Sequence, residues 1–143
     1  DYVSGFMLAD SVYCWFRKHK NISFNITNQH RKYFIYGKNL IGSSHGDGAK
    51  MVDMPLLMAN EAPLQWANTL YRYIYLHHIH HKDVTKFKSG KDYQGVTVEY
   101  LRSPSGTDSW HHRKGYQHAP KAIEAFIHHK DFGQCARLTH LFK

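Results

Sequence analysis

The stretch Tyr71-Arg72-Tyr73-Ile74-Tyr75-Leu76-His77-His78-Ile79-His80-His81 decides the fold, because it joins an apolar, aromatic segment to a run of histidines. Residues 71–80 are predicted to form a strand, in which side chains alternate faces, so His78 and His80 point to the same side. Histidines in this pattern at a strand end offer two neutral nitrogen ligands to zinc, manganese or iron. The alternatives are a surface cluster of histidines without function and an expression tag. An internal run that is interrupted by Ile79 argues against a tag.

The composition is typical of a folded protein with a basic surface. The chain has 143 residues, 42% of them hydrophobic, and we expect one domain over residues 1–143. Its formal net charge of +8 favours a polyanionic partner, such as a phosphate-bearing substrate or nucleic acid. No apolar run approaches the ~18 residues that span a bilayer, so we expect no membrane association. Cys14 and Cys135 are the only cysteines in the sequence, which predicts reduced thiols and a cytoplasmic location, the host cytoplasm if the chain is phage-encoded.

The hydrophobic pattern changes between helical and strand-like spacing along the chain. Helical spacing predicts helices over residues 5–19 and 54–70, with Pro63 placed to begin a second helical segment. Strand-like patterns predict the following strands: residues 22–27, 31–36, 40–44, 71–80, 93–102 and 135–142. Residues 120–128 fit either a short helix or a strand, and residues 82–91 and 103–117 are predicted to be loops. The fold class expected is α/β, with α+β as the alternative, built as a mixed β-sheet sandwich flanked by helices.

A second histidine lies where another predicted strand ends. His45 follows residues 40–44 and is surrounded by small residues, among them Gly42, Gly46 and Gly48. Small residues allow a ligand or a metal ion to approach the backbone closely. In α/β sheets, sites form at strand termini and on the loops that follow them. We therefore expect His45 to join His78 and His80 in one metal site, although a histidine in an ordinary turn is the alternative.

Two short blocks resemble the calcineurin-like metallophosphoesterases. Ser44-His45-Gly46-Asp47 is similar to the penultimate His-Gly block of that family. His77-His78-Ile79-His80 is similar to the final Gly-His-x-His block, with His77 in place of the glycine, and the predicted helix between the two blocks also fits. Asp1, followed by an amphipathic helix, resembles the end of the Gly-Asn-His-Asp block. Residues 101–112 resemble a phage-encoded branch of the family.

The resemblance implies hydrolysis of a phosphoester, by a phosphodiesterase, a phosphatase or a nuclease, at two divalent metal ions. Mn, Zn, Fe and Co all suit mixed histidine and carboxylate ligands. His45 and His78 would bind one ion and His80 the other, and Asp1 would orient a catalytic histidine that precedes it. Four further residues are candidates for binding the phosphate of the substrate: Lys82, Arg102, His111 and His112.

The resemblance also implies that the chain is the C-terminal portion of a metallophosphoesterase-like domain whose N-terminal part is missing. The Asp-x-His and Gly-Asp-x-x-Asp blocks, which supply the bridging aspartate in that family, have no visible counterpart in the sequence. Two divalent cations ~3.5–4 Å apart repel each other and need anionic bridges. Three neutral histidines do not complete such a site. We expect the chain to act with its N-terminal segment, with a second copy or with another chain.

Two other functions compete with the enzyme. A basic nucleic-acid-binding module without catalysis would use some of the ten tyrosines and eight phenylalanines to stack bases. Most of these aromatic residues have the alternating or helical spacing that is typical of a core. A structural zinc protein would need a closed site with four ligands, and no cysteine is near His45 or His78 in the sequence.

Overall fold

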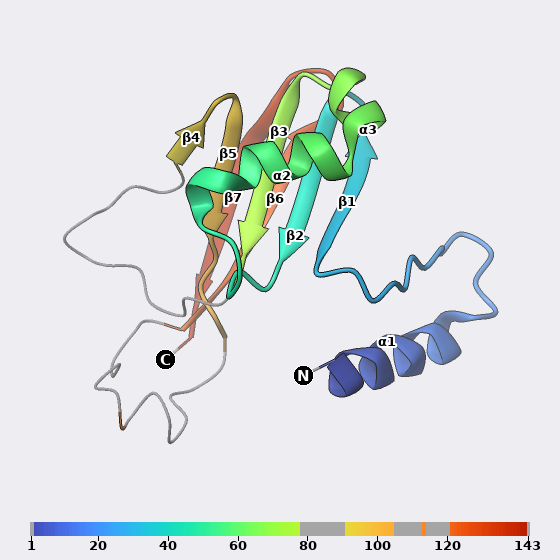
Figure 1. Ribbon diagram of the computed structural model, residues 1–143. Coiled ribbons are helices and arrows are strands. Elements are labelled where there is room, and N and C mark those ends of the chain that lie inside the picture. The colour runs from blue at the N-terminus through green and yellow to red at the C-terminus, as the bar shows by residue number, and fades with distance from the viewer. Residues whose placement is uncertain (1, 78–90, 105–112, 114–120, 143) are drawn as a thin grey trace. The chain divides into compact units, whose positions relative to one another are not determined.

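The computed structural model describes residues 2–77, 91–104, 113 and 121–142 (Figure 1). The chain divides into two compact units, Asp1–His30 and Arg31–Lys143. The single domain expected over residues 1–143 stays a prediction.

The first unit contains helix α1, Tyr2–Phe16, followed by an irregular segment. Many apolar side chains of the helix are exposed, including Trp15 at 81%. The ring of Tyr13 meets the ring of Phe24 edge-on, with 5.5 Å between the ring centroids, so the irregular segment folds back on the helix. At 15 residues α1 is the longest described helix, and none of the helices in the described ranges is long and apolar enough to cross a membrane.

The second unit is built around a mixed sheet that has five strands among the described residues, in the order β1-β2-β3-β5-β4. These strands have the following bounds: β1 Arg31–Tyr36, β2 Asn39–Ser44, β3 Tyr71–Leu76, β4 Lys91–Tyr93 and β5 Val96–Tyr100. The three central strands, β2, β3 and β5, are parallel, and each edge strand is antiparallel to its neighbour. Leu40–Gly42 of β2 and residues 73–76 of β3 are buried, as expected for parallel strands covered on both faces.

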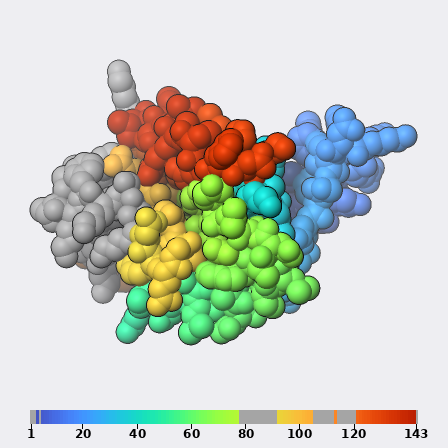
Figure 2. Space-filling view, turned by 90° about the horizontal axis from the view of Figure 1, so that it is seen from above, coloured from blue at the N-terminus to red at the C-terminus, as the bar shows by residue number. Residues whose placement is uncertain are grey.

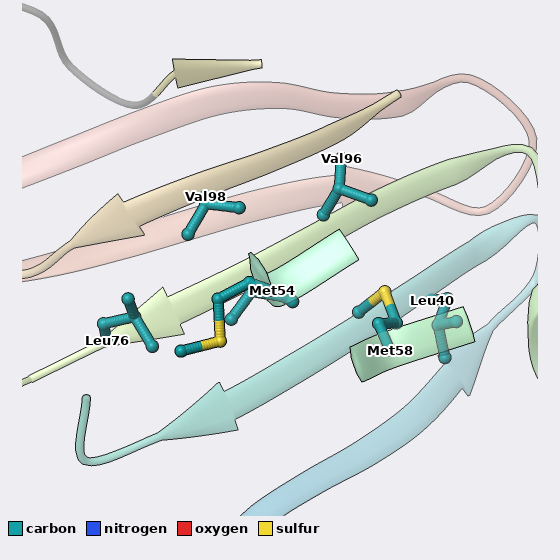
Figure 3. Packing of buried hydrophobic residues seen from close by; sticks show 7 residues of the cluster. Leu40, Met54, Met58, Leu76, Val96 and Val98 are labelled. Carbon is teal, nitrogen blue, oxygen red and sulfur yellow. The ribbon is translucent and has the colours of Figure 1, made fainter. Parts of the chain in front are cut away.

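Short helices connect β2 to β3 and cover one face of the sheet. They are the 3₁₀ helix η1, Met51–Asp53, and helices α2, Met54–Glu61, and α3, Pro63–Ala67. Proline in the first turn of α2 and of α3 suits the fixed φ angle of that residue, because the amide that proline lacks would have no partner there. Met54 and Met58 of α2 are fully buried against the sheet, with Met58 beside Leu40 (Figure 3).

The opposite face of the sheet is covered by an antiparallel hairpin of β6, Ala122–His129, and β7, Gly133–Leu141 (Figure 2). Tyr75 of β3 stacks on Phe126 of β6 with 4.5 Å between the ring centroids, and Tyr73 meets His128 edge-on at 4.6 Å. The hydroxyl of Tyr75 also donates a 3.0 Å hydrogen bond to Oε1 of Gln134. The layer between sheet and hairpin is therefore aromatic and polar, in contrast to the aliphatic layer under the helices.

One arginine on the hairpin binds two buried carboxylates in this layer. Nη1 of Arg137 donates to Oε1 of Glu99 at 2.5 Å, and Nη2 of Arg137 donates to Glu124. The side chains of Glu99 and Glu124 are 6% and 3% exposed. Carboxylates that are buried this deeply need a cationic partner to offset the loss of hydration, so this network fixes the hairpin to β5.

The fold class is confirmed as mixed α/β, with a mixed sheet, a small antiparallel sheet and helices. The second helix begins at Pro63, as predicted, and residues 122–129 form a strand, which was one of the two forms expected there. The strand predicted over residues 71–80 is confirmed up to Leu76. The strand ends before His77, and residues 78–80 lie outside the described residues.

One strand prediction is wrong and a second is right only in part. Residues 22–27 alternate in polarity but form no strand, because no neighbouring segment pairs with them and local alternation alone supplies no ladder hydrogen bonds. The strand predicted over residues 93–102 is confirmed for Val96–Tyr100, which form β5, but its first residue belongs to β4, and a turn joins the two strands into a hairpin. Gln94 and Gly95 form that turn with φ of 48° and 80°, the positive values that tight hairpin turns require.

The burial of Met58 in the aliphatic layer predicts that shortening this side chain strongly destabilises the fold. Met58→Ala should lower the free energy of unfolding by about 2–5 kcal/mol, because a fully buried side chain leaves a cavity when it is truncated. Leu56→Ala on the same helix is the matched control, since Leu56 is 63% exposed, and it should change stability by less than about 0.5 kcal/mol. Chemical denaturation of both variants measures the difference, and equal effects would contradict the assignment of the core.

The aromatic layer predicts a pH dependence of stability at His128. Burial lowers the pKa of His128 below its usual range, so near that range the unfolded chain binds more protons than the folded chain. Stability should therefore fall as the pH drops through the unfolded pKa of about 6.5. His128→Gln should reduce the loss of stability between about pH 7.5 and about pH 5.5 in denaturation experiments, whereas His140→Gln, at an exposed position, should not. An unchanged pH dependence in His128→Gln would contradict the prediction.

Candidate functional site

The three parallel strands end together at one edge of the sheet, which we call the carboxyl edge. Ser44 of β2 pairs with Leu76 of β3, and Leu76 pairs with Tyr100 of β5. The arrowheads of the three strands point to this end in Figure 1. The carboxyl edge consists of the residues that follow the strands: residues 45–47, residue 77 and residues 101–102. Ligands of open α/β sheets bind outside this end of the strands.

His45 and His77 lie side by side at the carboxyl edge. The backbone amide of His77 donates to the carbonyl oxygen of His45 at 3.0 Å, directly after the last pair of β2 and β3. The amide of Leu101 donates to the carbonyl oxygen of Leu76 at 2.7 Å on the other side of β3. Hydrogen bonds therefore hold the backbone on both sides of β3 where the histidine run begins. His77, the first residue of the run, is next to His45.

The loop after His45 is fixed by a glycine and a tyrosine. Gly46 is buried and has a φ of 91°, a conformation that side chains rarely adopt. A β-carbon on Gly46 would lie 3.0 Å from Cε1 of Tyr100 and 3.1 Å from Cβ of Leu76. The hydroxyl of Tyr100 donates to the carbonyl oxygen of Gly46 at 3.1 Å. Close packing and this hydrogen bond hold the backbone next to His45 in place.

The surroundings of His77 favour its neutral form. Burial lowers the pKa of His77 below its usual range, and the charge of His45 lowers it further. The second effect acts through space, so the two imidazoles are within electrostatic range of each other. Neutral imidazole is the form that binds a metal ion, and the surroundings of His77 favour that form.

Arg102 is held at the same edge by the hairpin. Its backbone amide donates to Oε2 of Glu124 at 3.2 Å, and Glu124 is the carboxylate that Arg137 binds. The backbone amide of Ala122 also donates to the carbonyl oxygen of Ser103 at 3.2 Å. Arg102 thus adds a cation to the edge on which His45 and His77 lie, at a position that the hairpin stabilises.

Of the residues that the sequence nominates, the structure describes His45 and Arg102, both at the carboxyl edge. The other six lie outside the described residues: Asp1, His78, His80, Lys82, His111 and His112. The convergence of His45 with His78 and His80 stays a prediction. Among residues 2–77, 91–104, 113 and 121–142, no group of three or more His, Cys, Asp or Glu side chains is placed to hold a metal ion.

Two residues, His77 at the carboxyl edge and Tyr100 at the end of β5, were not nominated as site residues from the sequence. His77 was matched only to a glycine, although its place beside His45 follows once β2 and β3 are known to pair in parallel. Tyr100 was assigned only to a strand face. No sequence signal showed that its hydroxyl binds the backbone of Gly46, a residue 54 positions earlier.

Comparisons of the chain with family models, with curated proteins and with solved structures find no match. The description of the site therefore rests on the geometry of this chain.

The packing around Gly46 predicts that this position does not tolerate a side chain. Gly46→Ala should destabilise the protein by about 1–3 kcal/mol, because alanine would be strained at a positive φ and would press on Tyr100 and Leu76. Gly48→Ala is the matched control in the same loop, since a β-carbon there meets nothing within 4 Å. Thermal or chemical denaturation distinguishes the two, and a neutral Gly46→Ala would contradict the close packing of this loop.

Proposed function

We propose that the chain forms part of a metal-dependent phosphoester hydrolase of the metallophosphoesterase type. The observation that carries the proposal is the hydrogen bond between His77 and His45 at the ends of two neighbouring parallel strands. It supports a shared site for the two blocks that resemble the family, because the backbone of one block touches the backbone of the other. The element order supports the same proposal, since η1, α2 and α3 lie between the blocks.

In the proposed site, His45 and His78 bind one divalent ion and His80 binds the other. Mn, Zn, Fe and Co remain the candidate ions, because neutral imidazole nitrogen suits borderline metals. Two such ions, when bound, polarise the phosphoryl group and acidify a water molecule. The pairing of β2 with β3 and the fixed loop at Gly46 support this role for His45, because they hold the backbone beside it.

The substrate we propose is a phosphoester, and Arg102 is the candidate among the described residues for contacting its phosphate. A guanidinium group donates two parallel hydrogen bonds to phosphate oxygens, and the amide bond to Glu124 keeps Arg102 at the carboxyl edge. Three more candidates for this role lie outside the described residues: Lys82, His111 and His112.

Ligand charge indicates that this site needs further residues. His45, His78 and His80 are neutral ligands, and two divalent ions held close together need anionic ones. We propose that carboxylates reach the carboxyl edge from an N-terminal segment, from a second copy of the chain or from another chain. Asp1 would then orient a histidine that directly precedes it.

Nucleic-acid binding without catalysis is the competing proposal, and the net charge of +8 favours it. Base stacking, however, requires exposed aromatic faces. Tyr73, Tyr75 and Phe126 pack in the layer between sheet and hairpin, whereas Phe34, Tyr36 and Phe132 are exposed. The charge is equally suited to a phosphate-bearing substrate, and we place the enzyme first because of the contact between His45 and His77.

Metal titration of the untagged chain tests the proposed site. Calorimetry at about pH 7.5 should detect binding of manganese or zinc, and His78→Ala or His45→Ala should weaken it by about tenfold or more, because each removes a direct ligand. The wild-type affinity should also fall at about pH 5.5, where protons compete for the imidazoles. His140→Ala, on β7, is the control and should bind as the wild type does.

Two results would contradict the proposal. Equal affinity at the two pH values would exclude neutral histidine ligands, and loss of binding in His140→Ala alone would place the metal elsewhere.

Hydrolysis of a chromogenic phosphodiester with manganese tests the activity. We expect turnover when the chain is extended by its preceding segment, and a His78-dependent turnover by the chain alone would contradict the need for further ligands.

A further inference from the structure

We propose that one face of β1 binds single-stranded nucleic acid, by stacking bases on Phe34 and Tyr36 and by binding phosphates with lysines on either side of these rings. We call this surface the β1 platform, and it consists of Lys32, Phe34 and Tyr36 on the strand and Lys38 in the turn that follows. The binding surface does not depend on the proposed function, and only its link to the carboxyl edge rests on that function.

The platform residues of β1 lie on one face of the strand. Arg31 and Tyr33 face the helical side, because their side chains donate hydrogen bonds to Glu61 at the end of α2. Successive side chains of a strand point to opposite faces, so the platform residues face the side on which the hairpin lies. The pairing of Phe34 with Ile41 agrees with this, since Ile41 belongs to the cluster that packs under the hairpin.

The hairpin leaves the platform accessible. Its side chains contact Tyr75 of β3 and Glu99 of β5, whereas Phe34 and Tyr36 on β1 are 56% and 49% exposed. The two aromatic residues are two positions apart, which separates them by ~6.4–6.8 Å along the strand. Exposed aromatic rings stack nucleic-acid bases with little regard to sequence, because every base has a π-face.

Lysines flank the two rings. Lys32 precedes them and Lys38 follows them, and both are exposed. Within the part of the chain that the structure describes, no carboxylate forms an ion pair with either lysine. Lys130 of the hairpin is brought to the same end, since its carbonyl oxygen accepts a 2.6 Å hydrogen bond from the amide of Lys38, but its charge is offset by Asp131 at 3.4 Å. Lys32 and Lys38 are therefore available to phosphates, in line with the net charge of +8.

The charge of the platform favours a polyanion over a second copy of the chain. β1 is an edge strand of the sheet that the structure describes (Figure 1). Lysine on an edge strand disfavours pairing with an identical strand, because two copies would bring their lysines together. A single-stranded nucleic acid supplies phosphates for the lysines and unpaired bases for the rings.

The platform leads to the carboxyl edge. Because β1 is antiparallel to β2, Arg31 pairs with Ser44, the residue before His45, and Tyr36 lies at the far end. A nucleic acid that lies along the platform therefore has one end at the carboxyl edge. Under the proposed function, the substrate would be a phosphodiester of this strand.

Fluorescence anisotropy with a labelled single-stranded DNA of about 12 nucleotides tests the platform, with EDTA present so that binding does not depend on metal. Phe34→Leu and Tyr36→Leu keep an apolar side chain and remove the ring. Each should weaken binding by about fivefold or more, which is the scale of losing one stacked base. Ile35→Ala is the matched control on the opposite face of the same strand, where Ile35 is 47% exposed, and it should bind as the wild type does.

The dependence of binding on salt gives a second readout. Lys32→Gln should reduce the slope of log affinity against log salt concentration by about 0.7, because one phosphate contact is lost. Lys50→Gln is the control, since Lys50 is exposed at the start of η1 on the helical side, and it should leave the slope unchanged.

Three results would overturn the inference. Binding by Phe34→Leu and Tyr36→Leu that equals that of the wild type would exclude stacking. An equal loss in Ile35→Ala would show that the loss does not come from the platform. A wild type that binds no DNA and has the solution mass of a dimer, which Phe34→Leu returns to a monomer, would assign this face to a second copy.

The assay also separates this inference from the proposed function. DNA binding is measured without metal, so its failure leaves the hydrolase to be judged by metal titration. A failed metal titration, in turn, leaves the platform as a nucleic-acid-binding surface without the proposed catalysis.

Discussion

The parallel pairing of β2 with β3 is the constraint on which the rest of the described site depends. Parallel strands cannot be joined by a tight turn, so the chain must cross over between them, and η1, α2 and α3 form that crossover. The crossover carries Met54 and Met58 onto the sheet, where they complete the core. The same pairing brings the ends of two strands, far apart in sequence, to one edge, so that His45 and His77 become neighbours.

The two faces of the sheet stabilise this edge in different ways. On the helical face, aliphatic side chains and methionines exclude water. The resulting hydrophobic stabilisation does not depend on the orientation of the groups. The hairpin face relies on directed contacts, above all those of Arg137 with Glu99 and Glu124. Removing one member of a buried charged network leaves its partner without compensation, so such contacts restrict the geometry more than apolar packing does. Because Glu124 also binds the amide of Arg102, the hairpin determines where β5 leaves the sheet.

Local patterns in the sequence predicted the elements that are defined locally. The apolar, aromatic run of β3 and the proline at the start of α3 have direct physical consequences, and both were predicted correctly. Residues 22–27 show the limit of alternation, since a strand exists only with a partner that a local window does not contain. The turn at Gln94 and Gly95 was missed because alternation continues on both sides of it.

The candidate site shows the same division between local and distant information. His45 was nominated because a histidine among glycines at a strand end is a local signal. The contact between His45 and His77, and the hydrogen bond from Tyr100 to Gly46, depend on register between distant strands, which composition and spacing do not encode. Once the register is known, the role of Tyr100 follows from sterics: with a β-carbon at Gly46 the ring would have to move, and the loop that carries His45 would move with it. Gly46 therefore allows close approach by the protein itself, on the side where Tyr100 and Leu76 pack.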